Sequence, residues 1–158
     1  MENKIRVATE KDLSLILAFI KGLAEYEKMS DEVVASEDLL REWLFTKKVA
    51  KVIFALEEGK EVGFALYFYN FSTFLGKAGI YLEDLFVLPK YRKKGYGKLL
   101  LKTLAKEVVD NDMGRLEWSC LDWNNPSIEF YESIGAKMLK EWKVFRLTGE
   151  ELTTLSKE

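Results

Sequence analysis

A short segment of the chain concentrates residue types that can bind an anion. Residues 92–98 read RKKGYGK, so cations at Arg92, Lys93, Lys94 and Lys98 surround the glycines Gly95 and Gly97 and the aromatic Tyr96. A glycine loop that opens a helix lets backbone N–H groups approach an anion, and the helix N-terminus adds partial positive charge. The segment therefore predicts a phosphate site. It is not a dinucleotide fingerprint, which needs a glycine at Leu100, nor a P-loop, because Leu99 follows Lys98 where that motif needs Ser or Thr.

A strand before this loop and a helix after it would hold it in place. Residues 80–87 are apolar and β-prone, and Pro89 ends the run because proline cannot donate to a ladder. From Lys98 on, leucines at helical spacing predict a helix. The acidic pair Glu83-Asp84 interrupts the strand, which costs desolvation unless the acids are paired or face a cleft. They are candidates for holding a cation or relaying a proton, and the alternative is an edge pair satisfied by Lys or Arg.

A second segment supplies a candidate acid catalyst. Residues 123–136 read WNNPSIEFYESIGA, in which Pro126 suits the start of a helix and Gly135 the left-handed position that ends one. Tyr131 shares a helix face with Ile128. Its phenol could donate a proton to a departing group. The alternative is a core aromatic on an apolar face.

Composition excludes several classes of protein. The chain has 158 residues, 48% of them hydrophobic, which fits one packed domain spanning residues 1–158. A net charge of −2 argues against a general nucleic-acid surface. No apolar run is long enough to span a membrane, and the N-terminus is too polar for a signal peptide. The single cysteine, Cys120, is expected to be buried and fits a reducing, cytoplasmic location.

The absence of histidine narrows the chemistry further. With 0 histidines, a Ser-His or Cys-His nucleophile pair and a histidine metal site are excluded. A general acid or base must then be Asp, Glu, Lys, Tyr or a water molecule. We expect no metal.

The remaining elements follow from hydrophobic spacing and turn residues. Strands are expected over residues 4–8, 51–56, 62–68, 80–87, 116–121, 136–139 and 142–147, with a hairpin turn at 57–60 and an aromatic loop over 68–76. Helices are expected after the caps Thr9 and Ser36, from Lys98, and over 127–133. This order predicts a mixed α/β fold around one central sheet, flanked by helices.

The two chemical segments together resemble one enzyme superfamily. The pattern R-x-x-G-x-G at 92–97 resembles the acetyl-CoA pyrophosphate loop of the GNAT acetyltransferases, and residues 124–136 resemble their segment N-x-x-[AS]-x-x-[FL]-Y-x-x-x-G-[FA]. Within that superfamily, IRxAxxxD from Ile5, the helical segment 20–29, and the segments 62–68, 81–87 and 123–136 resemble the diamine (spermidine/spermine) and thialysine acetyltransferases. This likeness covers roughly four fifths of the chain.

The resemblance implies a function and a role for each candidate residue. The expected function is transfer of acetyl from acetyl-CoA, as co-substrate, to a primary amine of a small cation by direct attack in a ternary complex, on a GNAT fold with a splayed strand. The implied catalytic residues are Tyr131, as the acid that assists thiolate departure, and Glu83. The implied cofactor contacts are Leu85, Phe86, Val87, Arg92, Lys93, Lys94, Gly95, Tyr96, Gly97, Lys98, Asn124, Ser127 and Tyr131. The implied amine-site residues are Tyr26, Glu27, Glu83, Asp84 and Trp142.

Departures from the family pattern leave other functions open. An acidic residue that the polyamine enzymes place two before the C-terminal tryptophan has no clean match, since Glu141 is adjacent to Trp142. Asn124 could be only a turn residue before Pro126. The alternatives are acetylation of a protein N-terminus or another amine, and a non-catalytic acyl-CoA-binding module. The resemblance implies a homodimer, with which exposed aromatics such as Phe71 and Phe74 would be compatible.

Overall fold

A computed structural model describes residues 3–158 of the chain, which divide into two compact units. The first unit ends at Ser119 and the second begins at Cys120. The first unit contains β1 (Ile5–Val7), α1 (Leu13–Tyr26), α2 (Glu37–Leu40), β2 (Lys51–Glu57), β3 (Lys60–Ser72), β4 (Lys77–Val87), α3 (Tyr96–Asp110) and β5 (Leu116–Trp118). Its short helical turns are η1 (Glu10–Asp12), η2 (Ser30–Glu32), η3 (Arg41–Thr46) and η4 (Pro89–Tyr91). The second unit contains α4 (Asn125–Ser133) and α5 (Gly149–Ser156).

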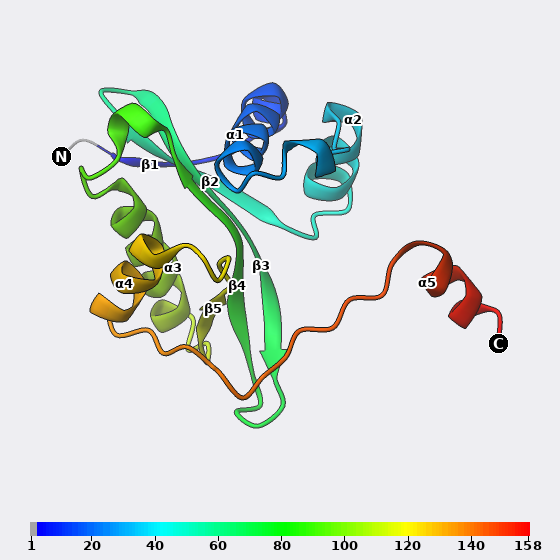
Figure 1. Ribbon diagram of the computed structural model, residues 1–158. Helices are drawn as coiled ribbons and strands as arrows, with labels where there is room; N and C mark the ends of the chain where they lie inside the picture. The colour runs from blue at the N-terminus through cyan, green and yellow to red at the C-terminus, as the bar shows by residue number, and fades with distance from the viewer. Residues whose placement is uncertain (1–2) are drawn as a thin grey trace. The chain divides into compact units, whose positions relative to one another are not determined.

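The first unit is built on one mixed sheet with the strand order β1-β2-β3-β4-β5. All neighbours are antiparallel except β4 and β5, which are parallel. Helices α1 and α3 cover opposite faces of this sheet (Figure 1). The expected mixed α/β fold, with a central sheet flanked by helices, is therefore confirmed. The expectation of one domain over residues 1–158 stays a prediction.

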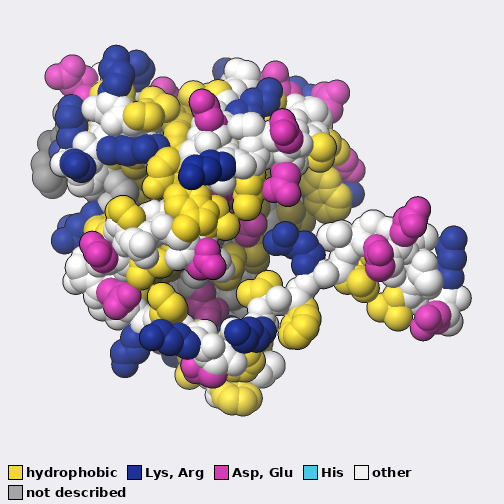
Figure 2. Space-filling model, in the orientation of Figure 1, with side chains coloured by type: hydrophobic (Ala, Val, Ile, Leu, Met, Phe, Trp, Pro, Cys, Tyr) yellow, Lys and Arg dark blue, Asp and Glu magenta, His cyan; other side chains and the backbone are white. Residues whose placement is uncertain are grey.

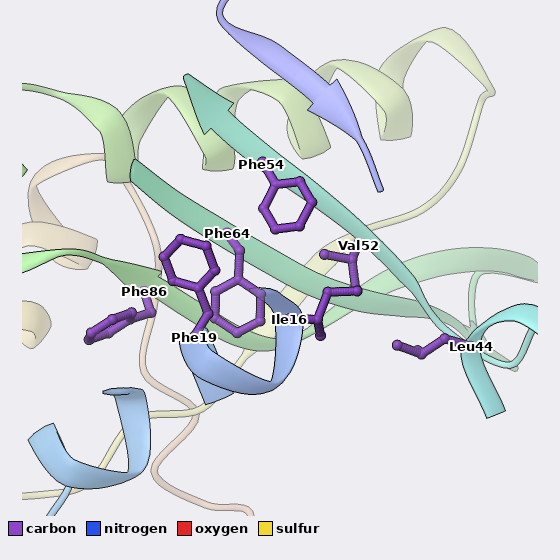
Figure 3. Packing of buried hydrophobic residues seen from close by; sticks show 7 residues of the cluster. All are labelled: Ile16, Phe19, Leu44, Val52, Phe54, Phe64 and Phe86. Carbon is purple, nitrogen blue, oxygen red and sulfur yellow. The ribbon is translucent and has the colours of Figure 1, made fainter. Parts of the chain in front are cut away.

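The core beneath α1 fixes where that helix lies on the sheet. It is a cluster of seven buried side chains: Ile16, Phe19, Leu44, Val52, Phe54, Phe64 and Phe86. Phe19 of α1 stacks on Phe64 of β3 with ring centroids 5.2 Å apart and meets Phe86 of β4 edge-on at 6.3 Å (Figure 3). Such ring pairs add specific geometry to the burial of apolar surface. This cluster seats α1 beside the part of β4 that contains the acidic pair.

Arg6 and Asp12, both part of the family-like N-terminal segment, have a structural role. The Arg6 guanidinium donates to both oxygens of Asp12 at 2.9 and 3.0 Å and to Glu61 at 2.6 Å. Its Cζ also lies 4.9 Å from the centroid of the Phe54 ring. Thr9 caps the following turn in a capping box with Asp12, as its position in the sequence predicted. These contacts join β1, β3 and the start of α1.

Several expected boundaries in the first unit are confirmed or need small corrections. The hairpin turn between β2 and β3 is confirmed, with positive φ at Glu58 and Gly59. The prediction of an aromatic loop over residues 68–76 is wrong for residues 68–72. Strand β3 continues to Ser72, and it pairs Tyr69 with Ile80 and Phe71 with Ala78. Helix α3 begins at Tyr96 rather than Lys98. Strand β5 ends at Trp118 rather than at residue 121.

The end of the chain differs most from expectation. The strands expected over 136–139 and 142–147 are not strands in the structure, whereas the helix α5 beyond them has no counterpart among the expected elements. Val144 and Phe145 in this stretch are 87% and 93% exposed. A β-prone segment becomes a strand only when another strand supplies the hydrogen-bond ladder. The second unit contains no strand that could do so.

The surface carries both signs of charge. On the face shown in Figure 2, basic, acidic and hydrophobic side chains are intermixed. This agrees with the small net charge of −2. No helix among residues 3–158 is both long enough and apolar enough to cross a membrane.

Candidate functional site

The glycine loop opens α3 as its sequence predicted. Gly95 is the N-cap of this 15-residue helix, in a left-handed conformation, and no side chain caps the helix. The first helical hydrogen bond runs from the Leu99 N–H to the Gly95 carbonyl, at 2.9 Å. The N–H groups of the first turn precede that bond and point out of the helix end. The loop thus presents the N-terminus of a long helix among exposed cations.

The two glycines of the loop are needed for different reasons. Gly95 has a φ of 90°, a conformation that other residues adopt at a cost. Gly97 has no positive φ, and a Cβ added there would meet no atom within 4 Å. The fold itself therefore does not require glycine at 97. A bare backbone at this position leaves room for a ligand to approach the first turn of α3 closely.

A hydrogen-bonded network ties the loop to the β2–β3 hairpin. The Tyr96 hydroxyl donates to Glu57 Oε1 at 2.7 Å, and Lys94 Nζ approaches the same oxygen at 3.4 Å. The Tyr96 hydrogen bond, aided by the Lys94 charge, lowers the pKa of the Glu57 carboxyl below its ordinary value. Glu57 was not among the residues singled out from the sequence. Only the contact between positions 39 residues apart reveals its role.

Arg92 makes contacts unlike those of the neighbouring lysines. Its Nε donates to the Val87 carbonyl at 2.9 Å. Its guanidinium carbon lies 4.8 Å from the centre of the Tyr26 ring and 5.3 Å from that of Phe86. The structure therefore brings Arg92 and Tyr26, predicted for different ligands, into contact with each other.

Glu83 occupies a β-bulge. Leu66 of β3 pairs with Asp84, and the next residue, Tyr67, pairs with Leu82, so β4 has one residue more than β3 at this point. That extra residue is Glu83, and it is exposed. A bulge bends the strand and changes the direction of the side chain it contains. The sequence showed the acidic pair but not the bulge, because register depends on the partner strand.

Three carboxylates gather between the end of α1 and the middle of β4. Burial, followed by the charges of Glu83 and Glu27, raises the pKa of Asp84 from 3.8 to about 6. Burial also raises the pKa of Glu27, the residue that follows α1. Within residues 3–158, none of the three has a Lys or Arg nitrogen within 4.0 Å. The alternative of an edge pair neutralised by Lys or Arg is therefore wrong, and the group can attract a cation.

The end of β4 has one edge without a strand partner. On one side, Leu85, Phe86 and Val87 pair with Ala65, Phe64 and Gly63 of β3. On the other side, pairing with β5 ends at Leu82 and Trp118, although β4 continues to Val87. The backbone groups along this edge can accept an extended ligand in the manner of an added strand. The side chain of Phe86 itself lies in the core, 6% exposed.

The other candidate residues lie in the second unit. Asn124 is the buried N-cap of α4, and its side chain accepts from the Ser127 N–H at 3.4 Å. Tyr131 lies on α4, half-buried, with its ring centroid 5.7 Å from that of Phe130. Gly135 has the expected positive φ of 96°. Trp142 is 71% exposed and is not part of a strand. The turn role of Asn124 is thus present in the structure.

One expectation about this unit is wrong. Cys120 is exposed rather than buried, because β5 ends before it and the residue follows the strand instead of packing within it.

Among residues 3–158, His, Cys, Asp and Glu side chains form no group of three or more that could hold a metal ion.

Comparison with known proteins identifies the family to which these features belong. The sequence model described as "Acetyltransferase (GNAT) family" matches residues 18–136. A thialysine N-epsilon-acetyltransferase of Bos taurus is 38% identical, with 96% of each chain covered. An L-ornithine N5-acetyltransferase of Arabidopsis thaliana is 34% identical, over 99% of this chain and 89% of that protein.

Solved structures agree on the fold. An integron cassette protein from the mobile metagenome of V. cholerae superposes with a TM-score of 0.81 at 33% identity, and the match covers 98% of both chains. An aminoglycoside acetyltransferase from an uncultured soil metagenomic sample, at 20% identity and a TM-score of 0.77, shares the fold alone.

Proposed function

Because this chain belongs to the acetyltransferase (GNAT) family and is an N-acetyltransferase, we propose that it transfers acetyl from acetyl-CoA to a primary amine of a small cationic acceptor. The observation that carries the cofactor half of the proposal is Gly97, whose bare backbone the fold does not need. The acidic group formed by Glu27, Glu83 and Asp84 supports the acceptor half.

We assign acetyl-CoA to the glycine loop and the end of β4. The backbone of residues 92–98, aided by Lys93, Lys94 and Lys98, would bind the pyrophosphate, since helix N-termini and cations both favour that charge. The unpaired backbone edge of Leu85, Phe86 and Val87 would hold the extended pantetheine arm. Asn124, Ser127 and Tyr131, which belong to the second unit, are assigned to acetyl-CoA on the family resemblance alone. The family relationship supports acetyl-CoA as the co-substrate.

In the proposed reaction the amine nitrogen forms a bond to the thioester carbonyl carbon, and the carbon–sulfur bond then breaks. A backbone N–H of β4 would hydrogen-bond the developing oxyanion. Tyr131 would protonate or hydrogen-bond the departing sulfur, and Glu83 would take the amine's proton through water. Most of the acceleration would come from holding both reactants in place. No covalent intermediate with the enzyme is required.

The acceptor is proposed from local charge and from the activities for which two relatives are named. Tyr26 and Glu27 at the end of α1, together with Glu83 and Asp84, would line the amine site. Trp142, in the second unit, is assigned to amine binding on the family resemblance alone. Two relatives are named for acetylation of thialysine and ornithine, both small amino acids with a side-chain amine. Carboxylates without a cationic partner would attract such acceptors.

An amine panel tests this proposal. The purified chain is mixed with acetyl-CoA and thialysine, ornithine, spermidine, a simple monoamine or a short peptide, and free thiol release is recorded. We expect the highest catalytic efficiency with one of the small di- or polycations. Preference for the peptide would favour protein N-terminal acetylation instead. CoA binding without turnover of any amine would favour a non-catalytic acyl-CoA-binding module.

A homodimer is proposed on family grounds. Phe71 and Phe74, near the tip of the β3–β4 hairpin, are 60% and 100% exposed, which is compatible with an interface there. Light scattering during gel filtration measures the mass, and a monomer at micromolar concentration would reject the dimer.

A further inference from the structure

The side chain of Arg92 lies at the junction of three elements. Its Nε donates to the carbonyl of Val87, the last residue of β4, at 2.9 Å. Its guanidinium packs on the ring of Tyr26, the last residue of α1, at 4.8 Å, and on the Phe86 ring at 5.3 Å. Its backbone begins the glycine loop. One side chain therefore contacts the end of α1 and the end of β4 from the loop itself.

The packing of α1 on β4 brings Tyr26 within reach of Arg92. A Cβ at Gly22 would lie 2.9 Å from Phe86 Cε2, so the glycine allows α1 to approach this ring closely. Tyr26 is four residues after Gly22, on the same helix face. Phe86 is anchored from the other direction by Phe19 in the core (Figure 3). The Arg92 guanidinium thus covers the aromatic edge where α1 meets the end of β4.

We propose that Arg92 is a positioning residue that couples the amine site to the acetyl-CoA loop, and that its side chain is not a phosphate ligand. The inference rests on the proposed function, because it takes Tyr26 and Glu27 as amine-site residues. Through Tyr26, Arg92 fixes the last turn of α1 and so the place of Glu27. Through Val87, it fixes the end of the strand along which the pantetheine arm would lie.

The chemistry of the contacts requires arginine rather than any cation. Only a planar guanidinium can stack on an aromatic ring while an in-plane N–H donates to a carbonyl. Lysine supplies a comparable charge but not this flat, forked geometry. Lysine, in contrast, can bind phosphate as a point charge, so lysine at position 92 would keep part of the CoA affinity if Arg92 were a phosphate ligand. The two roles therefore predict different outcomes for the conservative substitution.

The test compares Arg92→Lys and Arg92→Gln with two controls. Lys93→Gln removes an adjacent loop cation that has no such contacts, and Arg41→Gln removes an arginine that bridges Glu10 and Asp38 at the surface. Two quantities are measured by calorimetry: the dissociation constant of CoA at low and high salt, and that of the amine in the dead-end complex with CoA. The KM for the amine is measured alongside kcat.

We expect both Arg92 variants to weaken amine binding and raise the amine KM by about 10-fold, because misplacing a binding group by a fraction of an ångström is costly. CoA affinity and its salt dependence should change less than in Lys93→Gln, and lysine should not rescue the amine defect. A cycle with Tyr26→Ala should be non-additive for amine binding, since the two residues are in contact. Arg41→Gln should match the parent.

The opposite pattern would overturn the inference. If Arg92→Gln weakens CoA as much as Lys93→Gln does, and Arg92→Lys restores both ligands, Arg92 is a phosphate ligand. Additivity with Tyr26→Ala would also reject the coupling. None of the binding measurements needs turnover. A parent chain that binds both ligands without reacting would therefore reject the proposed function and leave the role of Arg92 decided by the binding data.

Discussion

The Tyr96 hydroxyl donates a 2.7 Å hydrogen bond to Glu57 Oε1, which joins the first turn of α3 to the last residue of β2. This bond holds the glycine loop against the sheet. We expect Tyr96→Phe to weaken CoA binding about 3- to 10-fold, in line with the net contribution of about 1 kcal/mol of a typical hydrogen bond. Isothermal calorimetry with CoA measures the effect.

Tyr69→Phe is the matched control for this prediction. The Tyr69 hydroxyl donates to Glu107 at 2.6 Å and accepts from Lys51. An equivalent bond to a carboxylate is therefore lost near the opposite end of α3 from the loop. Its CoA affinity should equal that of the parent. Equal weakening in both variants would mean that the effect is general and not exerted through the loop.

Substitution of the two loop glycines should separate folding from binding. Gly95→Ala places a Cβ at a φ of 90° and should lower the free energy of unfolding by about 1–2 kcal/mol. Gly97→Ala meets no atom within 4 Å and lies inside α3, so it should leave stability unchanged or raise it by up to ~1 kcal/mol. CoA should nevertheless bind more weakly to Gly97→Ala. Urea unfolding and calorimetry report the two quantities. A Gly97→Ala protein with full CoA affinity would contradict the close approach.

Asp84 should make the protein less stable as pH rises. The ordinary pKa of an aspartate carboxyl is 3.8, whereas that of Asp84 in the folded chain is about 6. Between these pH values the native state therefore binds more protons than the unfolded state. The free energy of unfolding should therefore fall as pH rises from about 4 to about 6 and stay level above that. Asp84→Asn should remove this slope and be more stable than the parent by about 1–2 kcal/mol at pH 8.

Urea denaturation of the parent and Asp84→Asn across pH 4 to 8 isolates this contribution, because other groups titrate alike in both proteins. Asp112 is a control of opposite sign, because its hydrogen bond with Lys77 lowers the pKa of its carboxyl instead of raising it. Its stabilising effect is lost only as pH falls below the ordinary value of 3.8. Parallel curves for parent and Asp84→Asn would show that Asp84 does not titrate as stated.

Tyr131→Phe tests the proposed acid. Removing the hydroxyl should lower kcat by about 10- to 1,000-fold, the range typical of a lost acid catalyst. The ring that neighbours Phe130 remains, so the fold and CoA affinity should persist. Thiol release under saturating substrates measures kcat, and CoA-dependent melting checks the binding. Turnover equal to the parent would remove Tyr131 as the acid and point to water.

Glu83→Gln tests the role of the residue in the bulge. It keeps the size of the side chain and its exposed position in β4, so the fold should be unaffected. Catalytic efficiency should drop more for spermidine or thialysine than for a monoamine, because the additional positive charge loses a partner. The KM for the dication should also become less sensitive to salt. A uniform loss across all amines would favour a proton-relay role over charge recognition.

Local signals in the sequence were sufficient for much of the fold. Apolar spacing predicted α1 and α3, proline and glycine predicted the ends of β4 and α4, and Ser36 and Thr9 are the caps they were expected to be. The glycine loop and the acidic pair could be recognised in the sequence because each consists of residues that are adjacent in the chain. Local pattern failed for residues 136–147, where β-prone side chains have no partner strand in their unit.

Tertiary structure alone decided what surrounds those residues. The bulge at Glu83 depends on the register of β3 against β4, which no single strand encodes. The high pKa of Asp84 depends on burial and on Glu27, which approaches from another element. Likewise, Arg92 contacts Tyr26 where Gly22 lets α1 approach Phe86 closely. The sequence by itself determined which groups can react, whereas packing between distant segments determined their charge state, direction and partners, because those depend on distances through space.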